Sequence, residues 1–379
     1  MIINNEHKKL NVPNLRFKEF QGEWEKCKLG DYGKVVTGNT PPTKDIENYE
    51  NGTYLWASPA DLGTIKLISE TKTMLSAKGF SKTRALPKGS VLVTCIGSTI
   101  GKTGMATKEM STNQQINSIV VNDNSDNEFV YYAIQSAFPR YLSSIAVQAV
   151  PIISKSAFEL LPNQRPCLQE QKKIGKMLSL LDERIATQNK IIDKLQSLIK
   201  GLRVRLIQIE NGNIVHLGEI ARIYQPQTIS STELTEDGFL VYGANGIIGK
   251  YKEYNHKTEQ ICITCRGNTC GMVNYTKPMS WITGNAMVIN TDEHQNKVCK
   301  RYLYHYLSAY NFNSLISGSG QPQIVRTPLE QLKVTLPTFL EQKQKATFLD
   351  KIQGKIEISN KTLNLYLQQK QYLLRQMFI

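Results

Sequence analysis

The chain has 379 residues, more than the roughly 100–200 of a typical domain, so two domains are expected. Its 40% hydrophobic content excludes a disordered chain, and its net charge of +14 favours a polyanionic partner, nucleic acid first among them. No segment is apolar enough to span a membrane, and the start MIINNEHKKLNV lacks a signal-peptide core, so a cytoplasmic protein is expected. Seven cysteines are an odd number for a disulfide framework, so reduced thiols are expected.

The first globular segment is expected over residues 15–165, after an N-terminal tail of residues 1–14. It opens with KLGDYGKVVTGNTPP, and further on short β-branched runs such as VLVTC from Val91 precede glycine-rich loops. A helical stretch is expected from Phe129. This alternation predicts a mixed α/β domain that consists mostly of strands.

A long helix is predicted for residues 168–210. Apolar residues recur there at alternating steps of four and three over more than four heptads, and only Gln188 interrupts them. Such a sustained pattern is typical of a coiled-coil seam. The predicted interface positions are Ile174, Leu178, Leu181, Ile185, Ile192, Leu195, Ile199 and Leu202.

The second half of the chain repeats the first. The segment EQKK from Glu170 aligns without gaps with EQKQ from Glu341, at a shift of 171 residues, and VLVTCIGSTIG resembles ICITCRGNTCG from Ile261. A second domain is therefore expected over residues 211–337 and a second long helix over residues 338–379. The interface positions predicted for that helix are Leu349, Ile352, Ile356, Leu363, Tyr366 and Leu373, with polar Ser359 at the place of Gln188.

Two seams of matched length most simply pack on each other. The alternative is that each helix docks separately on the core of one domain, in which case the two seams never meet.

No motif predicts catalysis. GSTIGKTG from Gly97 has one residue too few for a phosphate-binding loop, and its counterpart from Gly267 has no lysine, so a nucleotide-binding enzyme is the weakest alternative. Cys262, Cys265 and Cys270 lack the second ligand pair of a zinc site and are expected to be buried thiols. Neither a catalytic residue nor a metal site is predicted.

Loops that combine glycine with amide, hydroxyl or guanidinium side chains recur in both halves. Asn and Gln can bridge adenine, Arg can bridge guanine, and glycine permits close backbone approach, although such loops also occur as ordinary turns. The DNA-binding candidates are Thr37, Asn39, Thr40, Ser98, Thr99, Lys102, Asn113, Gln114 and Gln115 in the first half, and Asn245, Arg266, Asn268, Asn285, Ser319, Gln321 and Gln323 in the second.

The whole chain resembles the specificity (S) subunits of type I restriction–modification systems. The resemblance rests on PNLRFKEFQGEWEKCKLGDYGKVVTGNTPP, on the two domain-plus-helix units, and on the Leu-Pro and Glu-Gln-Lys sequences before each helix. It implies two target recognition domains, each reading one half of a bipartite, gapped DNA site. It also implies that the helices form an antiparallel coiled coil, with pseudo-two-fold symmetry, that fixes the gap.

The same resemblance places the chemistry in other subunits. It implies two modification subunits, docked on the outer helix faces, which methylate adenine N6 with S-adenosylmethionine. It further implies two restriction subunits that use ATP and Mg²⁺ to translocate and cleave DNA, and no cofactor in this chain. The alternative from another class is a coiled-coil scaffold that does not bind DNA and whose basic charge is incidental.

Overall fold

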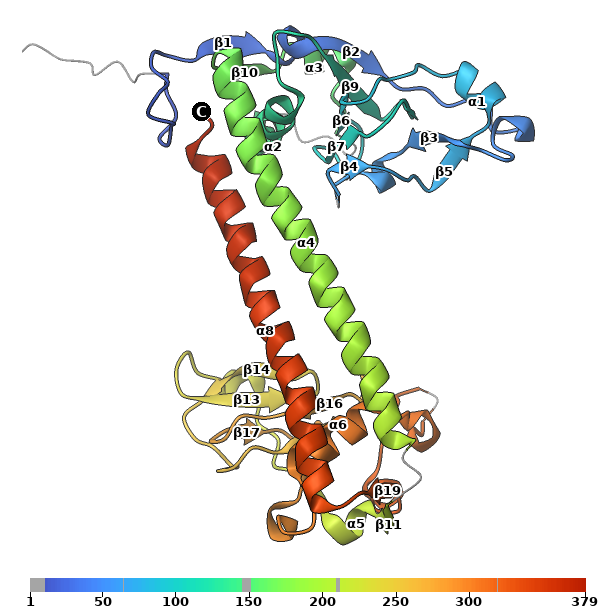
Figure 1. The fold of residues 1–379 in the computed structure, drawn as a ribbon, viewed down its shortest axis with the longest axis vertical. Helices are drawn as coiled ribbons and strands as arrows, with labels where there is room; N and C mark the ends of the chain where they lie inside the picture. Colours follow the sequence, from blue (N-terminus) through green and yellow to red (C-terminus); the bar gives the residue numbers. More distant parts are fainter. Residues whose placement is uncertain (1–10, 64, 145–150, 209–211, 319) are drawn as a thin grey trace, which may run out of the picture. The chain divides into compact units, whose positions relative to one another are not determined.

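The computed structural model describes residues 11–63, 65–144, 151–208, 212–318 and 320–379 (Figure 1). It divides into two compact units: unit 1 comprises Met1–Thr187 and Leu363–Ile379, and unit 2 comprises Gln188–Thr362. Two long helices, α4 (Leu168–Ile207) and α8 (Phe339–Gln376), each contribute to both units. The mixed α/β class with two long helices is confirmed. Among the described residues, no helix has the length and apolar character needed to cross a membrane.

Unit 1 is built on a five-stranded sheet of order β2-β9-β6-β7-β4, in which only the β4–β7 pair is parallel. Its strands are β2 (Gly33–Thr37), β9 (Ile116–Val121), β6 (Val91–Thr94), β7 (Thr103–Ala106) and β4 (Leu67–Ile68). A three-stranded sheet of order β5-β3-β8 comprises Thr73–Leu75, Tyr54–Ala57 and Ser111–Thr112. The unit also contains the antiparallel pair β1 (Glu25–Lys28) and β10 (Pro162–Arg165) and helices α1 (Ala77–Ser81), α2 (Asn127–Ser144) and α3 (Lys155–Glu159).

The core of unit 1 draws on both ends of the chain. Trp24, just before β1, meets Phe129 of α2 and Phe378 edge-on, with ring centroids 5.8 Å and 6.2 Å apart. The Leu15 amide donates to the Gln376 carbonyl at 2.8 Å. Burial of these rings stabilises the unit by the hydrophobic effect, so the last residues of the chain belong to the same core as the first strand.

Unit 2 has the same plan. Its four-stranded sheet of order β12-β18-β15-β16 comprises Arg222–Tyr224, Ala286–Asn290, Ile261–Thr264 and Val273–Tyr275. Its three-stranded sheet of order β14-β13-β17 comprises Gly246–Tyr251, Phe239–Gly243 and Trp281–Ile282. The unit also contains the antiparallel pair β11 (Asn213–His216) and β19 (Lys333–Leu336) and helices α5 (Leu217–Ile220), α6 (Lys300–Ala309) and α7 (Arg326–Glu330).

The internal repeat extends to strand register. In unit 1, Val91 faces Ile119 and Trp56 faces Ser111. In unit 2, Ile261 faces Ile289 and Val241 faces Trp281. The strand pairs β6–β9 and β15–β18 therefore carry equivalent residues at a constant shift of 170, and the predicted repeat is confirmed.

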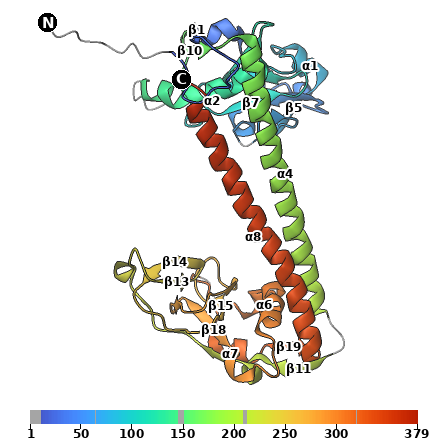
Figure 2. The same ribbon diagram turned by 60° about the vertical axis from the view of Figure 1, so that its left-hand side comes forward.

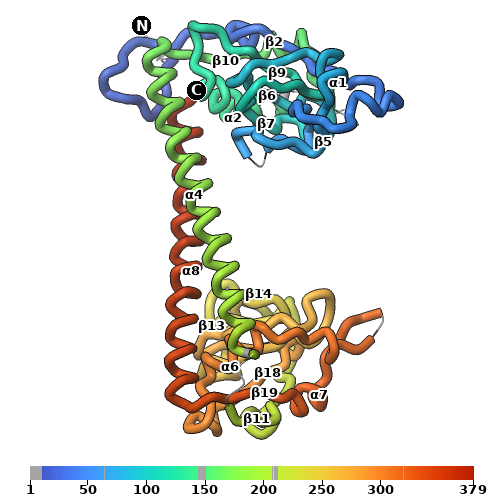
Figure 3. Tube along the Cα trace, turned by 45° about the vertical axis from the view of Figure 1, so that its right-hand side comes forward, coloured from blue at the N-terminus to red at the C-terminus, as the bar shows by residue number. Residues whose placement is uncertain are grey.

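Within each unit, α4 and α8 run antiparallel and lie side by side (Figures 2 and 3). In unit 1, Lys370 forms an ion pair with Asp182 at 2.7 Å. In unit 2, Gln188 Nε2 donates to the Ser359 carbonyl at 3.2 Å, and Arg203 Nη2 donates to Gln353 Oε1 at 3.4 Å. The two polar interruptions of the predicted seams thus meet each other, which satisfies a polar side chain within an apolar interface.

The structure places every predicted interface position in a buried or half-buried environment. The outermost of these residues also join the globular cores. Ile174 and Leu178 lie in the core of unit 1, and Ile199, Leu349 and Ile352 lie in the core of unit 2. The two packing schemes considered from the sequence are therefore combined, because each helix end packs on a domain core as well as on the other helix.

Charged side chains fasten unit 2 to its part of the helix pair. Arg301 of α6 donates from Nε to both carboxylate oxygens of Asp350 in α8, at 2.9 Å and 3.0 Å. His305 Nε2 lies 2.8 Å from Asp350 Oδ1, and Arg203 Nε of α4 donates to His305 Nδ1 at 3.1 Å. Although burial raises the pKa of Asp350, hydrogen bonds from His305 and Arg301 hold it at about 2.

Replacing Asp350 with alanine leaves Arg301 and the buried His305 without their acceptor. We expect unit 2 to lose roughly 2–3 kcal/mol of unfolding free energy, because unpaired buried polar groups retain their desolvation cost. Hydrogen exchange of unit 2 amides under increasing urea measures the loss. Glu357→Ala, which removes an exposed carboxylate from the same helix, is the control and should change little. Equal stability of the two variants would contradict the anchoring role of Asp350.

Candidate nucleic-acid interface

Three loops of unit 1 meet at the end of strand β6. The Cys95 amide donates to the Gln115 carbonyl at 2.8 Å, and the Ile153 amide donates to the Cys95 carbonyl at 2.8 Å. The Gly97 amide donates to the Pro151 carbonyl at 3.0 Å. One buried residue therefore joins the loop after β6, the loop before β9 and the segment that begins at Pro151.

Unit 2 repeats these bonds. The Cys265 amide donates to the Asn285 carbonyl at 3.2 Å, and the Ile324 amide donates to the Cys265 carbonyl at 3.0 Å. The Gly267 amide donates to the Pro322 carbonyl at 3.0 Å. We call this arrangement the loop frame: residues 95–102, 113–115 and 151–153 in unit 1, and residues 265–272, 283–285 and 322–324 in unit 2.

Two glycines close the first loop of each frame. Gly97 and Gly101 have φ angles of +92° and +91°, and Gly267 and Gly271 have φ angles of +85° and +90°. This left-handed region favours glycine because it has no Cβ. GSTIGKTG thus forms a tight connection between antiparallel strands β6 and β7. A phosphate-binding loop instead joins a strand to a helix, so this string lacks the structural setting of such a loop.

The cysteines of unit 2 lie in and beside the frame as separate thiols. Cys262 and Cys265 are buried, Cys270 is half-buried, and all are free. Burial raises the pKa of the Cys262 thiol, so this side chain remains protonated. Within the described part of the chain, no group of three or more His, Cys, Asp or Glu side chains is placed to hold a metal ion.

The predicted DNA-binding residues of unit 1 divide into exposed and internally bonded ones. Ser98, Lys102 and Gln114 are exposed, whereas Thr37, Thr99 and Gln115 are half-buried. Thr40 Oγ1 donates to Gln114 Oε1, so two loops distant in sequence lie together.

Two predicted residues of unit 1 use their amides inside the protein. Asn39 Nδ2 donates to the Lys82 carbonyl at 2.8 Å, and its Oδ1 accepts the Arg84 amide at 3.0 Å. Asn113 is buried, and both ends of its amide bond to Gln115. These contacts fix loop shape and leave less of each amide for a base edge.

Sequence reasoning missed Arg84. Its Nη1 donates to the Thr37 carbonyl at 2.7 Å, and its side chain is exposed beside the predicted loop residues. A guanidinium has five donors, so most remain for a phosphate or a base. The run Lys82-Thr83-Arg84 shows basic charge, but nothing in its spacing indicates that it lies against Thr37.

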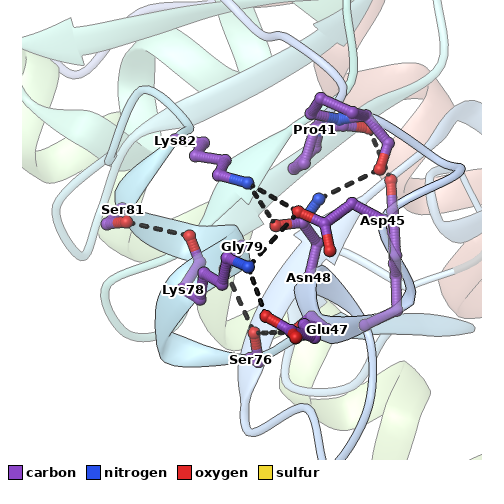
Figure 4. A network of polar contacts seen from close by, with 11 residues as sticks. Pro41, Asp45, Glu47, Asn48, Ser76, Lys78, Gly79, Ser81 and Lys82 are labelled. Atoms are coloured by element: carbon purple, nitrogen blue, oxygen red, sulfur yellow. Dashed lines mark hydrogen bonds and ion pairs between the residues drawn. The ribbon is translucent and has the colours of Figure 1, made fainter.

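A polar network holds the segment after Asn39 against helix α1 (Figure 4). Lys82 Nζ donates to Asp45 Oδ2 at 3.0 Å and to Asn48 Oδ1 at 2.8 Å. Asn48 Nδ2 donates to the Pro42 carbonyl at 3.0 Å. At Gly79 any side chain would clash with the Asn48 carbonyl, so the close approach of α1 requires glycine.

The predicted residues of unit 2 are more accessible. Asn245, Arg266, Asn268, Asn285, Gln321 and Gln323 are all exposed, whereas Ser319 lies outside the described residues. Arg266 and Gln323 face each other in an isolated antiparallel bridge. Asn245 lies in the β13–β14 hairpin, and Thr264 Oγ1 at the end of β15 donates to the preceding Ala244 carbonyl. Five of these six residues therefore lie in or beside the loop frame, and Asn245 lies on the neighbouring hairpin.

His256 supports the loop that contains Asn285 through a chain of hydrogen bonds. His256 Nε2 lies 2.8 Å from Tyr224 Oη, and its Nδ1 lies 2.6 Å from Asn255 Oδ1. Asn255 in turn bonds both the amide and the carbonyl of Ile282, at 2.8 Å and 2.9 Å. Burial lowers the pKa of His256 to about 4, so the neutral ring holds β17 just before residues 283–285.

Comparison with known proteins identifies this duplicated architecture. A family model described as "Type I restriction modification DNA specificity domain" matches residues 21–197 and again residues 210–367. Two such domains define a DNA sequence recognition protein. The chain belongs to the type I restriction–modification specificity subunit family, and its predicted resemblance to that family is confirmed.

Curated relatives carry the same description. The EcoprrI specificity subunit of Escherichia coli is 24% identical over 354 residues, covering 87% of both chains. The MjaVIII specificity subunit of Methanocaldococcus jannaschii is 24% identical and covers 91% of both chains. The MjaIX specificity subunit of the same organism is 29% identical over 208 residues, which span 52% of this chain and 48% of that relative.

Solved structures share the fold. The S subunit of a type I restriction–modification system from M. genitalium superposes with a TM-score of 0.72 at 19% identity, covering 97% of this chain and 99% of that one. A structure described as showing complex assembly and conformational transition of the type I R-M system has a TM-score of 0.55 at 16% identity, covering 93% and 96%.

The low pKa of His256 makes the stability of unit 2 depend on pH. The pKa of His256 is lower in the folded protein than in the unfolded chain, where it is near 6.5. The neutral ring therefore contributes its full stability at pH values above 6.5, and this contribution is lost as the pH falls towards 4. We expect a loss on the order of 3 kcal/mol over that range, and a smaller loss in His256→Gln. Urea unfolding at a series of pH values measures it. His294→Gln, outside this network, should retain the wild-type slope, and a His256→Gln slope equal to wild type would rule the explanation out.

Proposed function

We propose that each unit is a target recognition domain that reads one half of a bipartite, gapped DNA site. The observation that carries the proposal is the loop frame, in which two copies of one backbone arrangement present different side chains. Ser98, Lys102 and Gln114 are exposed on the first copy, and Arg266, Asn268 and Asn285 on the second. A repeated backbone suits two similar dockings on DNA, and unlike side chains suit an asymmetric site.

The net charge of +14 supports this proposal over a scaffold that does not bind DNA. Lysine and arginine contacts to phosphates release counterions, so the affinity should fall steeply as salt rises. A scaffold with incidental charge would give no sequence-specific shift in an electrophoretic assay at any salt concentration.

We further propose that the two long helices set the gap. Helix α4 has 40 residues and begins in unit 1 and ends in unit 2, so it spans about 60 Å at about 1.5 Å per residue. Its partner α8 has 38 residues. The antiparallel seam, with Gln188 meeting Ser359, supports a spacer role because the polar layer fixes the register of the two helices.

The outer faces of the helices would dock two modification subunits. Ile358, Leu365 and Tyr372 of α8 follow one another at seven-residue intervals and are exposed. Leu180, Ile191 and Leu198 of α4 are also exposed and share one helix face. Exposed apolar stripes of this kind favour a protein partner.

In this proposal the chain selects the DNA site and catalyses no reaction. Modification subunits would methylate adenine N6 with S-adenosylmethionine, and restriction subunits would use ATP and Mg²⁺, all in the cytoplasm. The support is that the curated relatives are specificity subunits of restriction enzymes.

Arg266→Ala and Gln323→Ala test the assignment of unit 2. We expect each to relax base preference in one half-site only, weakening binding roughly ten-fold at the affected position, as for loss of a good base contact. Selection of bound duplexes from a random library, followed by sequencing, measures this. Arg205→Ala removes the same charge as Arg266→Ala, but from α4, and should alter the base preference of neither half-site. Changes in both halves, or in neither, would show that these side chains do not read bases.

Inserting one heptad into each long helix at the Gln188 and Ser359 layer tests the spacer. Seven residues add about 10 Å, which is about three base pairs of DNA at ~3.4 Å per pair. We expect the same two half-sites with a longer preferred gap. The wild-type gap, recovered unchanged in the same selection, would refute the role of the helices as a ruler.

A further inference from the structure

The loop frame places a pair of isoleucines in unit 1 where unit 2 has its arginine and glutamine. Ile96 and Ile152 face each other in an isolated antiparallel bridge, and so do Arg266 and Gln323. The bridges are flanked by the same backbone bonds, because Gly97 reaches Pro151 as Gly267 reaches Pro322. The two pairs therefore occupy equivalent positions.

Side-chain direction also matches. Successive residues of an extended segment point to opposite faces. The inner neighbours are buried in both units: Cys95 and Ile153 are 1% and 4% exposed, and Cys265 and Ile324 are 0% and 2% exposed. Ile96 and Ile152 therefore point outward, as Arg266 and Gln323 do, and Ile152 is 53% exposed.

A single exposed isoleucine is common on protein surfaces and needs no explanation. This pair is notable for its position, because the equivalent residues of unit 2 are Arg266 and Gln323, the two side chains there best suited to read bases. We infer that Ile96 and Ile152 are specificity-determining residues that contact the C5-methyl group of a thymine in the first half-site. This inference rests on the proposed function and specifies which base the base-reading surface of unit 1 contacts.

The chemistry of the major groove narrows the choice of ligand. Thymine alone among the four bases presents a methyl group there, beside its O4 acceptor, whereas guanine, cytosine and adenine offer only hydrogen-bond donors or acceptors. Two isoleucines can satisfy none of those polar groups, so pressing them against guanine, cytosine or adenine leaves buried groups unpaired. The pair thus favours thymine by contact with its methyl group and disfavours the other bases by desolvation.

Deoxyuridine provides a direct test because it differs from thymidine only by that methyl group. The probe is a duplex selected by the full chain, with the thymidines of one half-site replaced by deoxyuridine one at a time. We expect at least one replacement in the first half-site to weaken binding roughly 3- to 10-fold. In Ile152→Ala, which truncates a largely exposed side chain and should fold normally, the same replacement should cost nothing further.

Two control variants sharpen the comparison. Ile65→Ala truncates another exposed isoleucine of unit 1, 62% exposed, and should keep the full deoxyuridine penalty. Gln323→Ala should also keep it, because its own effect falls in the other half-site.

Three outcomes overturn the inference. They are tight binding with every first-half thymidine replaced, a first half-site with no fixed A·T pair, and a deoxyuridine penalty that persists undiminished in Ile152→Ala. In each case the half-site selectivity of Arg266→Ala would still stand, so the proposed function survives. Absence of any sequence preference in the wild-type chain would instead refute the proposed function itself.

Discussion

The backbone of one buried residue in each unit organises the surface that we propose reads DNA. The amide and carbonyl of Cys95 bond to two different loops, and the amide and carbonyl of Cys265 do the same. Buried backbone groups must be paired, so these bonds persist whatever side chains the loops carry. The fold thereby separates the geometry of the loops, which is constant between the units, from their chemistry, which differs.

The two units are fastened to the helix pair by different residues. In unit 2, Asp350 of α8 accepts from Arg301 and His305 of α6. In unit 1, Asp182 of α4 accepts a hydrogen bond from Tyr132 of α2 at 2.6 Å and pairs with Lys370 of α8. The repeat conserves a carboxylate between domain and helices, although it sits on α8 in one unit and on α4 in the other.

Periodicity and self-comparison predicted the large features. The two seams, the repeat and the glycine-rich loops all depend on local spacing, which the sequence displays directly. A heptad pattern specifies an apolar stripe without its partner, so the sequence could not decide that Ile174 and Leu178 pack on the unit 1 core as well as in the seam. Much of that core comes from α2, some 40 residues earlier in the chain.

Side-chain partners were the harder problem. Asn113 has the amide expected of a base-reading residue, yet it bonds to Gln115, two residues along the chain, in a local turn. Asn39 has such an amide too, yet it bonds to the Lys82 carbonyl, which only the tertiary fold brings within reach. Arg84 and the Ile96–Ile152 bridge were overlooked for the same reason. An apolar residue in a loop does not by itself indicate a binding role. The role of Ile96 and Ile152 is indicated only when the structure aligns them with Arg266 and Gln323 of unit 2.

The composition of unit 1 has a consequence for biosynthesis. Unit 2 is one continuous stretch of chain, whereas unit 1 needs Leu363–Ile379 to cover Trp24 and Phe129 with Phe378. Synthesis of unit 2 is therefore complete while unit 1, although begun first, still lacks its last residues. The unit that is begun first is thus the last to be completed, and its aromatic core cannot close until the end of the chain has been made.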